Sequence, residues 1–568
     1  MQTYLFIFTI GPVQSFIAQA RKTQDLYAGS QLLSDLIGFA MAKTRESGEI
    51  IFPFSDAKSK PNRFVAKITC QDVKTFGNNL QSMVREELKR IASDALGKWF
   101  DIASYQIEDF LETYWAAIIY DESKEYHKQY KELETTLGGV KNYRVFKQLS
   151  VPEQGRKCSV NGFYNALFYR KQDKEVNQSF DVLREKKYLS NNTIIVDNES
   201  MVGLGIIQKG EGICGLTLLK RRYKESLTTF PSTANIALLH ILNNQAIKDS
   251  GALTPLLNCD GASESTIDNF NGQLLFSENI NKEYFKKQEI KCNEDKFSDC
   301  FKNFEKVVKQ ENLKFLKYYA VIVFDADDMG KKLSACDSIE KHKELSLKLS
   351  EYAEWAREYV NKGRGKTIYA GGDDFMGLLN LKTLFESIEE LRKKFGEQFQ
   401  VEQLTFSAGI AIAHYKAPLG EVLSYARKME HIAKEQDGKN AFGITLIKHS
   451  GETHETVLPW TSTIHEDKWY PSMLKLIQES LKDKISPSFI KVLDEEIRVW
   501  DNKSSDFAEI TSHEIARLLS RANKFADNTL LEKISQDIVL LYNESNFKDN
   551  TTYFTNALNI ADFINRKF

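Results

Sequence analysis

The sequence predicts an α+β protein that contains a β-α-β-β-α-β sheet, the ferredoxin-like arrangement, and a degenerate second copy of it. Three observations carry this prediction. An apolar run of strand length, YYAVIVF at 318–324, precedes a segment with helical periodicity. Two short apolar runs then flank the turn GGDD, as in a hairpin. A second helical segment and one more strand complete the order.

The elements of this unit follow one another along the chain. A helix from about 337 to 359 is predicted because apolar residues recur at three- and four-residue steps: Leu345, Leu349, Tyr352, Ala356 and Tyr359. Strands are predicted at 366–370 and 375–380, on the two sides of the turn. The same spacing predicts a second helix through Leu384, Ile388, Leu391 and Phe395. The last strand is QLTFSAGIAIA at 403–413.

This topology brings distant carboxylates together. The first β-α-β crossover leaves strands one and two parallel, with strand three between them. The end of strand one, where Asp325 lies, therefore meets the sheet edge that carries Asp373 and Asp374. A turn alone explains Gly371 and Gly372, which tolerate positive φ, but it does not need two carboxylates. Three carboxylates at one edge favour a site for a divalent cation.

The remaining regions are predicted from weaker patterns. The N-terminal region has strands at 5–10 and 64–69 and helical segments at 13–20, 32–42 and 73–96. Its first strand ends in TIGP and no GGDD-like turn follows, so this second copy lacks the metal ligands. Helical spacing predicts mostly helices at 230–315 and from about residue 455 to the end.

Composition limits the class of protein. The 568 residues suggest three or four domains. The formal net charge is −2, whereas a protein that binds nucleic acid alone through a broad phosphate footprint is usually more basic. Seven cysteines argue against a secreted disulfide framework, which favours a cytoplasmic location. The apolar run Tyr4 to Ile10 is too short to span a membrane, and no membrane partner is expected.

Five stretches suggest a family. They are GPVQSFIAQARKTQDLYAGS at 11–30, PNRFVAK at 61–67, GRKCS at 155–159, AGGDDF at 370–375 and SAGIAIAHYKAPL at 407–419. Together they resemble, in the same order, the large subunit of type III CRISPR effector complexes in its Cmr branch (type III-B). The resemblance covers about residues 1–450. AGGDDF is shared with GGDEF-type cyclases, whereas the N-terminal stretch is more specific.

The resemblance implies a domain layout. It implies two palm domains of the nucleotidyl cyclase/polymerase type, with helical intervening and C-terminal domains. The degenerate N-terminal palm would span 1–150, and a middle region with a zinc-finger-like segment and a helical part would span 151–315. The catalytic GGDD palm would span 316–450, and the helical C-terminal domain 451–568.

The resemblance also implies the site residues. Asp325, Asp373 and Asp374 match the family's catalytic aspartates, which hold two Mg²⁺ or Mn²⁺ ions, and Gly371 and Gly372 match its nucleotide-binding glycines. Hard oxygen ligands suit both metals.

Two lysines are further candidates by resemblance. The segment AKEQDGKN, which ends at Asn440, is similar to the family's lysine-containing element after the palm. Lys434 and Lys439 are then candidates to contact the triphosphate of ATP, which is the substrate. Solvated charges at a helix end are an equally good interpretation of both lysines.

Two features depart from the family. Many relatives carry an N-terminal HD nuclease domain, but no His-Asp dipeptide occurs among the nine histidines, so we expect no such domain. Many relatives also hold zinc in the middle region. Here Asn161 stands where a second cysteine would complete the pair with Cys158, and Cys214, Cys292 and Cys300 lack Cys-x-x-Cys partners. Bound zinc is therefore not expected.

Three functions remain open at this point. The resemblance implies an RNA-activated synthase that converts ATP to an adenylate second messenger, with the other Cmr subunits, guide CRISPR RNA and target RNA as partners. A free-standing GGDEF-type nucleotidyl cyclase and a non-catalytic scaffold of the ribonucleoprotein are the alternatives. The acceptor could be a second ATP, which gives oligoadenylates, or another adenosine-containing molecule.

Overall fold

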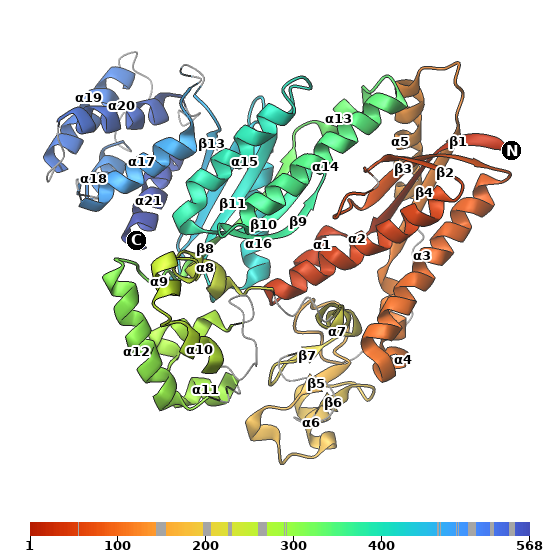
Figure 1. The fold of residues 1–568 in the computed structure, drawn as a ribbon, viewed down its shortest axis with the longest axis horizontal. Coiled ribbons are helices and arrows are strands. Elements are labelled where there is room, and N and C mark those ends of the chain that lie inside the picture. The colour runs from red at the N-terminus through yellow and green to blue at the C-terminus, as the bar shows by residue number, and fades with distance from the viewer. Residues whose placement is uncertain are drawn as a thin grey trace. The chain divides into compact units, whose positions relative to one another are not determined.

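Helices and strands are mixed along the whole chain, which confirms the predicted α+β class (Figure 1). The computed structural model describes residues 1–568 apart from 55, 144–154, 197–205, 225–229, 260–269, 289, 291, 463, 464, 466, 484, 487, 498–506, 523–527, 545–550 and 568. Two compact units divide the chain. The first consists of Met1–Phe230 and Gly330–Ala353, and the second of Pro231–Met329 and Glu354–Phe568.

The first unit is built on a four-stranded sheet. Its strands are β1 (Gln2–Gly11), β2 (Gly48–Phe52), β3 (Arg63–Cys70) and β4 (Glu112–Ile119). The strand order is β2-β3-β1-β4, and all neighbours are antiparallel. The helices of this region are α1 (Gln14–Ala18), α2 (Thr23–Arg45), α3 (Val73–Leu96), α4 (Phe100–Phe110) and α5 (Tyr126–Asn142). The sequence prediction missed β2 and β4.

A small three-stranded sheet completes the first unit. Its strand order is β6-β5-β7, with β5 (Phe168–Arg170), β6 (Ile194–Val196) and β7 (Gly212–Ile213). Helices α6 (Phe180–Lys187) and α7 (Gly215–Arg222) accompany it. Strands of two or three residues carry no periodic signal, which is why the sequence did not predict them.

The second unit contains a six-stranded sheet in the order β13-β12-β11-β8-β10-β9. Its strands are β8 (Tyr318–Ala326), β9 (Gly365–Gly371), β10 (Asp374–Asn380), β11 (Phe406–His414), β12 (Ala441–Ile447) and β13 (Thr453–Pro459). β10 lies between β8 and β9 and is antiparallel to both, as the crossover argument predicted. Along the chain, the helices between these strands are α13 (Met329–Ser334), α14 (Ile339–Asn361), α15 (Leu384–Gln398) and α16 (Leu419–Lys434), and Gly330–Ala353 of α13 and α14 belongs to the first unit.

The helical regions lie where the spacing predicted them, with one correction. Residues 230–315 form α8 (Thr233–Leu242), α9 (Gln245–Asp249), α10 (Thr254–Cys259), α11 (Lys282–Gln288) and α12 (Glu294–Gln310). The C-terminal helices are α17 (Tyr470–Asp483), α18 (Ser488–Ile497), α19 (Phe507–Ala522), α20 (Asn528–Glu544) and α21 (Thr551–Lys567). Residues 455–459, predicted as helical, belong to β13 instead. The first four residues of β13, THET, are all polar, so the strand does not show the alternation of apolar and polar residues that predicts a strand.

The predicted domain boundaries stay predictions. The boundary at 150/151 lies outside the described residues, and the two compact units do not test those at 315/316 and 450/451. Among the helices of the described residues, none has the length and apolar character needed to cross a membrane.

Three aromatic rings support the sheet edge where the predicted carboxylates lie. Phe324 of β8 stacks on Phe375 of β10 and on Phe406 of β11, with ring centroids 4.9 and 4.1 Å apart. All three side chains are buried. Because the stack joins three strands beside Asp325 and Asp374, it stabilises the pairing of the strands at this edge of the sheet.

Candidate metal and nucleotide site

Strand pairing brings the predicted carboxylates to one place. Asp325, near the end of β8, is the direct cross-strand partner of Asp374, the first residue of β10. The Ala326 N–H donates to the Asp373 carbonyl at 2.9 Å, so the turn is attached to the end of β8. Like charges directly opposite one another destabilise a sheet. The position of Asp325 and Asp374 therefore needs a reason other than stability.

The Asp374 carboxyl is held in an unfavourable environment. The residue as a whole is half-buried, but its Oδ1 is buried and has no hydrogen-bond partner within the described part of the chain. Burial raises the pKa of Asp374 well above its usual range, and the charges of Asp373 and Asp325 raise it further. A buried carboxyl oxygen without a hydrogen-bond partner is the kind of atom that a cation stabilises.

Gly371 and Gly372 of the turn are favoured as glycines for two different structural reasons. Gly372 has φ +79°, and a Cβ built there would meet no atom within 4 Å. A Cβ on Gly371 would collide with the ring of Tyr369. The Tyr369 hydroxyl donates to the Gly371 carbonyl at 3.4 Å. The turn thus leaves open space in front of Gly372, where a phosphate could approach the backbone.

Lys434 lies at the carboxylates. It ends α16 and forms ion pairs with Asp325 and with Glu430, the second at 2.8 Å. Burial lowers the pKa of Lys434, but Asp325 and Glu430 more than offset this, so its pKa is raised. The ammonium group is therefore charged at neutral pH and offsets part of the negative charge at this edge.

Lys439 lies beside a different carboxylate, Asp328, at 2.9 Å. The loop that carries it is held by Asp327, which accepts hydrogen bonds from Thr405 Oγ1 (2.7 Å), Ser407 Oγ (2.8 Å) and the Asn440 N–H (3.1 Å). Sequence reasoning did not single out Asp327 or Asp328. The acidic run DADD was the available signal, but nothing in it separates a carboxylate that holds a loop from one that binds a metal.

The carboxylate oxygens at this edge are the type of ligand that a divalent cation prefers, but they are not arranged as a complete metal-binding site. Within the described residues, no three His, Cys, Asp or Glu side chains come together as a ready-made metal site. Asp325 is instead paired with Lys434. The fit rests on hard carboxylate oxygens and on the buried, unpartnered Oδ1 of Asp374. Metal binding by these residues stays a prediction.

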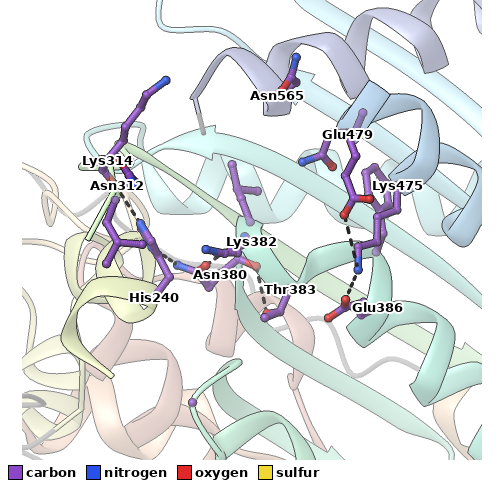
Figure 2. Close-up of a pocket in the computed structure, with 15 residues that line it drawn as sticks. His240, Asn312, Lys314, Asn380, Lys382, Thr383, Glu386, Lys475, Glu479 and Asn565 are labelled. Atoms are coloured by element: carbon purple, nitrogen blue, oxygen red, sulfur yellow. Dashed lines mark hydrogen bonds and ion pairs between the residues drawn. The ribbon is translucent and has the colours of Figure 1, made fainter. Parts of the chain in front are cut away.

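A cavity of about 400 Å³ lies at the far end of the same strand (Figure 2). Asn380, the last residue of β10, lines it, together with His240, Lys382 and Lys475. His240 Nε2 lies 2.9 Å from the Lys314 carbonyl oxygen, and Lys475 is paired with Glu386. The described residues that line this cavity do not include Asp325, Asp373 or Asp374. The cavity is therefore separate from the predicted site.

Two family models match the chain. The model described as "Cas10/Cmr2, second palm domain" matches residues 318–443, which include β8 to β11 and the carboxylates. The model described as "CRISPR-associated protein Cmr2, N-terminal" matches residues 5–60. The two matches cover the two regions that carry most of the motifs quoted above.

One curated relative and two solved structures are similar over nearly the whole chain. The CRISPR system Cmr subunit Cmr2 of Pyrococcus furiosus is 24% identical, over 93% of this chain and 70% of the relative. A chain of the type III-B Cmr-beta complex in its apo state matches with a TM-score of 0.66 at 15% identity, over 93% of this chain and 78% of that one. The same complex bound to cognate target RNA gives 0.69 at 15% identity, over 99% and 83%.

The structural likeness, at this level of identity, shows the fold. The two domain matches and the relative add sequence evidence along the same chain. As the five quoted stretches implied, the chain is similar to the Cmr2 subunit of type III-B CRISPR complexes, in the second palm domain and the N-terminal region above all.

Proposed function

We propose that the chain is the nucleotidyltransferase subunit of a type III CRISPR ribonucleoprotein, which converts ATP to an adenylate second messenger when target RNA binds. One observation carries this proposal: Asp325 and Asp374 are direct cross-strand partners, and Asp373 precedes Asp374 in the turn. Like charges directly opposite one another cost stability, so a role in chemistry is the best reason for the arrangement.

The reaction is attack by the 3′-hydroxyl of one nucleotide on the α-phosphorus of ATP, with loss of pyrophosphate. Asp325, Asp373 and Asp374 would hold two Mg²⁺ or Mn²⁺ ions, which when bound supply neutralising charge to the phosphates and promote deprotonation of the hydroxyl. The carboxylates thus orient the reacting groups, and the open space at Gly372 admits a phosphate close to the backbone.

The two lysines have distinct proposed roles. Lys434, now paired with Asp325, would exchange this partner for a triphosphate oxygen when nucleotide enters. Lys439 is held near the same end of β8 by Asp328, on a loop that Asp327 fixes. Both ammonium groups therefore start from defined positions, which lowers the entropy lost when nucleotide binds.

The two main sheets support a two-palm architecture. The four strands of the first sheet and the strands β8 to β11 of the second have the same connectivity and strand order, which is the order of a ferredoxin-like fold. We propose that the first is a palm domain without catalytic carboxylates and that the second is the catalytic palm. The proposed domains are 1–150, 151–315, 316–450 and 451–568.

The proposed partners follow from the family and from the charge. Other Cmr subunits, guide CRISPR RNA and target RNA would surround the chain in a cytoplasmic complex. The solved relative bound to cognate target RNA supports this proposal through its fold alone. A formal net charge of −2 indicates that RNA contacts are local or shared with neighbouring subunits.

A non-catalytic scaffold is the second candidate function. The observation that favours it is the ion pair of Lys434 with Asp325, because the ammonium already offsets charge where a metal would bind. The two functions predict opposite results for nucleotide turnover by the assembled complex.

The decisive experiment is chromatography of products from labelled ATP, incubated with the assembled complex in Mg²⁺, with and without RNA matched to the guide. We expect adenylate products only with matched RNA. Products formed by the lone subunit without RNA would favour a free-standing cyclase. An intact, RNA-bound complex that consumes no ATP would favour the scaffold.

Two matched variants test whether ATP conversion depends on the carboxylates of the turn. Asp373→Ala with Asp374→Ala is expected to abolish conversion and leave assembly intact. Asp437→Ala removes an exposed carboxylate from the loop before Lys439 and should retain conversion. Equal activity of both variants would contradict the assignment.

A further inference from the structure

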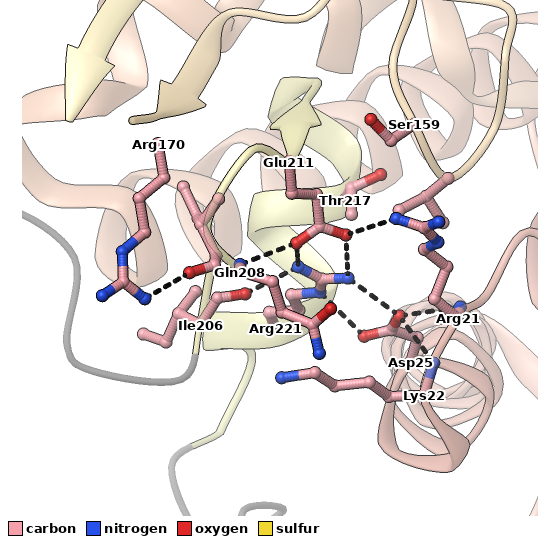
Figure 3. Close-up of polar contacts among 12 residues, drawn as sticks. Arg21, Lys22, Asp25, Ser159, Arg170, Ile206, Gln208, Glu211, Thr217 and Arg221 are labelled. Carbon is pink, nitrogen blue, oxygen red and sulfur yellow. Dashed lines mark hydrogen bonds and ion pairs between the residues drawn. The ribbon is translucent and has the colours of Figure 1, made fainter. Parts of the chain in front are cut away.

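Two short segments of the first unit converge on a pair of cysteines. One is the turn at 157–165, where Cys158 and Asn161 have the spacing Cys-x-x-Asn. The other is the start of α7, where Cys214 and Thr217 have the spacing Cys-x-x-Thr. The segments are joined through Ser159, whose N–H donates to the Gly212 carbonyl at 2.7 Å. Figure 3 labels Ser159 and Thr217, one from each segment.

Side-chain contacts connect all four positions, which we name the thiol–amide cluster: Cys158, Asn161, Cys214 and Thr217. Asn161 Nδ2 donates to Cys214 Sγ at 3.1 Å. Thr217 Oγ1 lies 3.3 Å from Cys214 Sγ and 3.4 Å from Cys158 Sγ. The Val160 N–H donates to Cys158 Sγ at 3.5 Å. Each half of the cluster thus bonds to the other half without any added group.

The donors of the cluster do not fit zinc. A structural zinc ion takes four ligands, which are thiolates or imidazoles. Here two of the four positions carry a neutral amide and a neutral hydroxyl. Within the part of the chain that the structure describes, no third His, Cys, Asp or Glu completes a metal-binding group with the two thiols.

We infer that the thiol–amide cluster is a zinc-free joint, in which the Asn161 amide and the Thr217 hydroxyl occupy the places of two zinc-ligating cysteines and hold the two segments together by hydrogen bonds. The two-residue gap in each half is the spacing of paired zinc ligands. An amide and a hydroxyl stand at two of the four positions with this spacing, and their hydrogen bonds connect the two segments as a bound metal ion would.

Charges around the cluster are balanced without a divalent cation. A hydrogen bond from the Cys214 thiol lowers the pKa of Cys158 to about 5, and burial raises the pKa of Cys214. The pair therefore has one acidic thiol, that of Cys158, rather than the four thiolates of a tetrathiolate zinc site. Lys220 of α7 is fully buried nearby; burial lowers its pKa to about 8, while Asp25 and the two thiols oppose this shift. Its ammonium supplies the opposite charge.

The joint holds α7 against the first sheet's helices. At the other end of α7, the Arg221 Nε donates to Asp25 Oδ1 of α2 at 3.1 Å, and its Nη1 to Glu211 Oε2 at 2.8 Å (Figure 3). At the beginning of α7, the Gly215 N–H donates to Gln106 Oε1 of α4 at 2.8 Å. Loss of the cluster should therefore loosen the attachment of the small sheet.

The first test uses the unmodified full-length chain. The chain is expressed in zinc-supplemented medium and purified, and its zinc content is measured by mass spectrometry. Its Tm is then measured with and without a strong zinc chelator. We expect no stoichiometric zinc and the same Tm in both conditions. About one zinc per chain that the chelator removes, with a fall in Tm, would overturn the inference.

The second test separates the hydroxyl from the shape of Thr217, which is buried. Thr217→Val keeps the shape and removes the hydroxyl, and should lower the Tm by a few degrees. Thr217→Ser keeps the hydroxyl and should lower it less. A smaller loss in Thr217→Val than in Thr217→Ser would show that the hydrogen bonds do not hold the joint, against the inference.

A gain-of-function variant completes the test. Asn161→Cys with Thr217→Cys supplies four thiols at the paired spacing, and this protein should bind about one zinc per chain and acquire a chelator-sensitive Tm. A folded double variant that binds no zinc would overturn the claim that these positions correspond to zinc ligands. If the double variant does not fold, the measurements on the unmodified chain and on the Thr217 variants still decide.

Discussion

The first sheet and the strands β8 to β11 of the second share one strand order and one set of strand directions, yet they differ at equivalent edges. In the second sheet, Asp374 begins the third strand and pairs with Asp325 of the first strand. In the first sheet, Arg63 begins the third strand and pairs with Thr9 of the first strand. The comparison teaches that this topology forms without carboxylates at that edge. The opposed aspartates are therefore not required by the fold.

Polar groups at the two edges are satisfied to different degrees. At the first edge, Asn62 accepts hydrogen bonds at its carbonyl from the Thr9 hydroxyl (3.1 Å) and the Ile10 N–H (2.9 Å), beside a cavity of about 550 Å³. At the second edge, Asp374 Oδ1 is buried and lacks a partner among the described residues. Proteins tolerate such unsatisfied groups mainly at functional sites. The contrast marks the second edge as the one that carries chemistry.

The largest expected effect is on turnover, and it comes from removing a carboxylate charge from the second edge, since the equivalent pair in the first sheet, Thr9 and Arg63, has none. Asp325→Asn keeps the side-chain shape and removes the charge. If Asp325 holds the metal ions, the variant should lose on the order of 3 kcal/mol or more of transition-state stabilisation, a fall in turnover of at least about 100-fold. The measurement is the rate of ATP conversion by the RNA-bound complex. Raised Mn²⁺ should restore part of the rate, and normal turnover at limiting Mg²⁺ would remove Asp325 from the site.

The reverse change tests the first edge. Thr9→Asp places a carboxylate at the position equivalent to Asp325, where the side chain is buried and faces the Asn62 carbonyl. We expect it to lower the free energy of unfolding by roughly 2–4 kcal/mol, because the new charge meets an acceptor instead of a donor. Denaturant titration measures the loss. Thr9→Val is the control and should cost about 1 kcal/mol or less; equal losses would contradict the charge argument.

The glycines distinguish the two edges further. Residues 53–62, which join β2 and β3 at the equivalent place in the first sheet, contain no glycine. In the second sheet, Gly371→Ala should cost about 1–3 kcal/mol of unfolding free energy because its Cβ collides with Tyr369. Gly372→Ala should cost about 1 kcal/mol through its positive φ alone. Thermal unfolding ranks the two variants, and a larger loss for Gly372→Ala would contradict the proposed order.

The smallest expected effect is a pH dependence of protein stability, measured in the presence of a metal chelator. We predict its direction only. Burial, Asp373 and Asp325 raise the pKa of Asp374 in the folded chain. The folded state thus retains a proton that the unfolded state releases above about pH 4. This contribution to stability is full below that pH and is lost as the pH rises through the raised pKa. Asp374→Asn should therefore raise the Tm at pH 7, with less difference near pH 4. A Tm difference that does not change with pH would show that Asp374 is not repelled as described.

Long, strongly patterned segments were predictable from the sequence. Apolar spacing predicted a helix at 73–96, and α3 spans Val73–Leu96. The apolar run at 318–324 lies within β8, and the GGDD turn lies between β9 and β10 as predicted. The strands β2, β4 and β13 were not predicted. Their residues do not alternate clearly, and only pairing with a neighbouring strand makes them strands.

The convergence of Asp325, Asp373 and Asp374 could be predicted from the sequence, because the crossover leaves the first two strands of the unit parallel and so places the end of β8 beside the turn between β9 and β10. The packing of the folded chain, and no pattern in its sequence, selects the partners of these side chains. It paired Lys434 with Asp325 and Lys439 with Asp328, and it buried Oδ1 of Asp374. It also joined the four residues of the thiol–amide cluster. These contacts join segments far apart in the chain, and no periodic pattern encodes which side chains meet across such a distance.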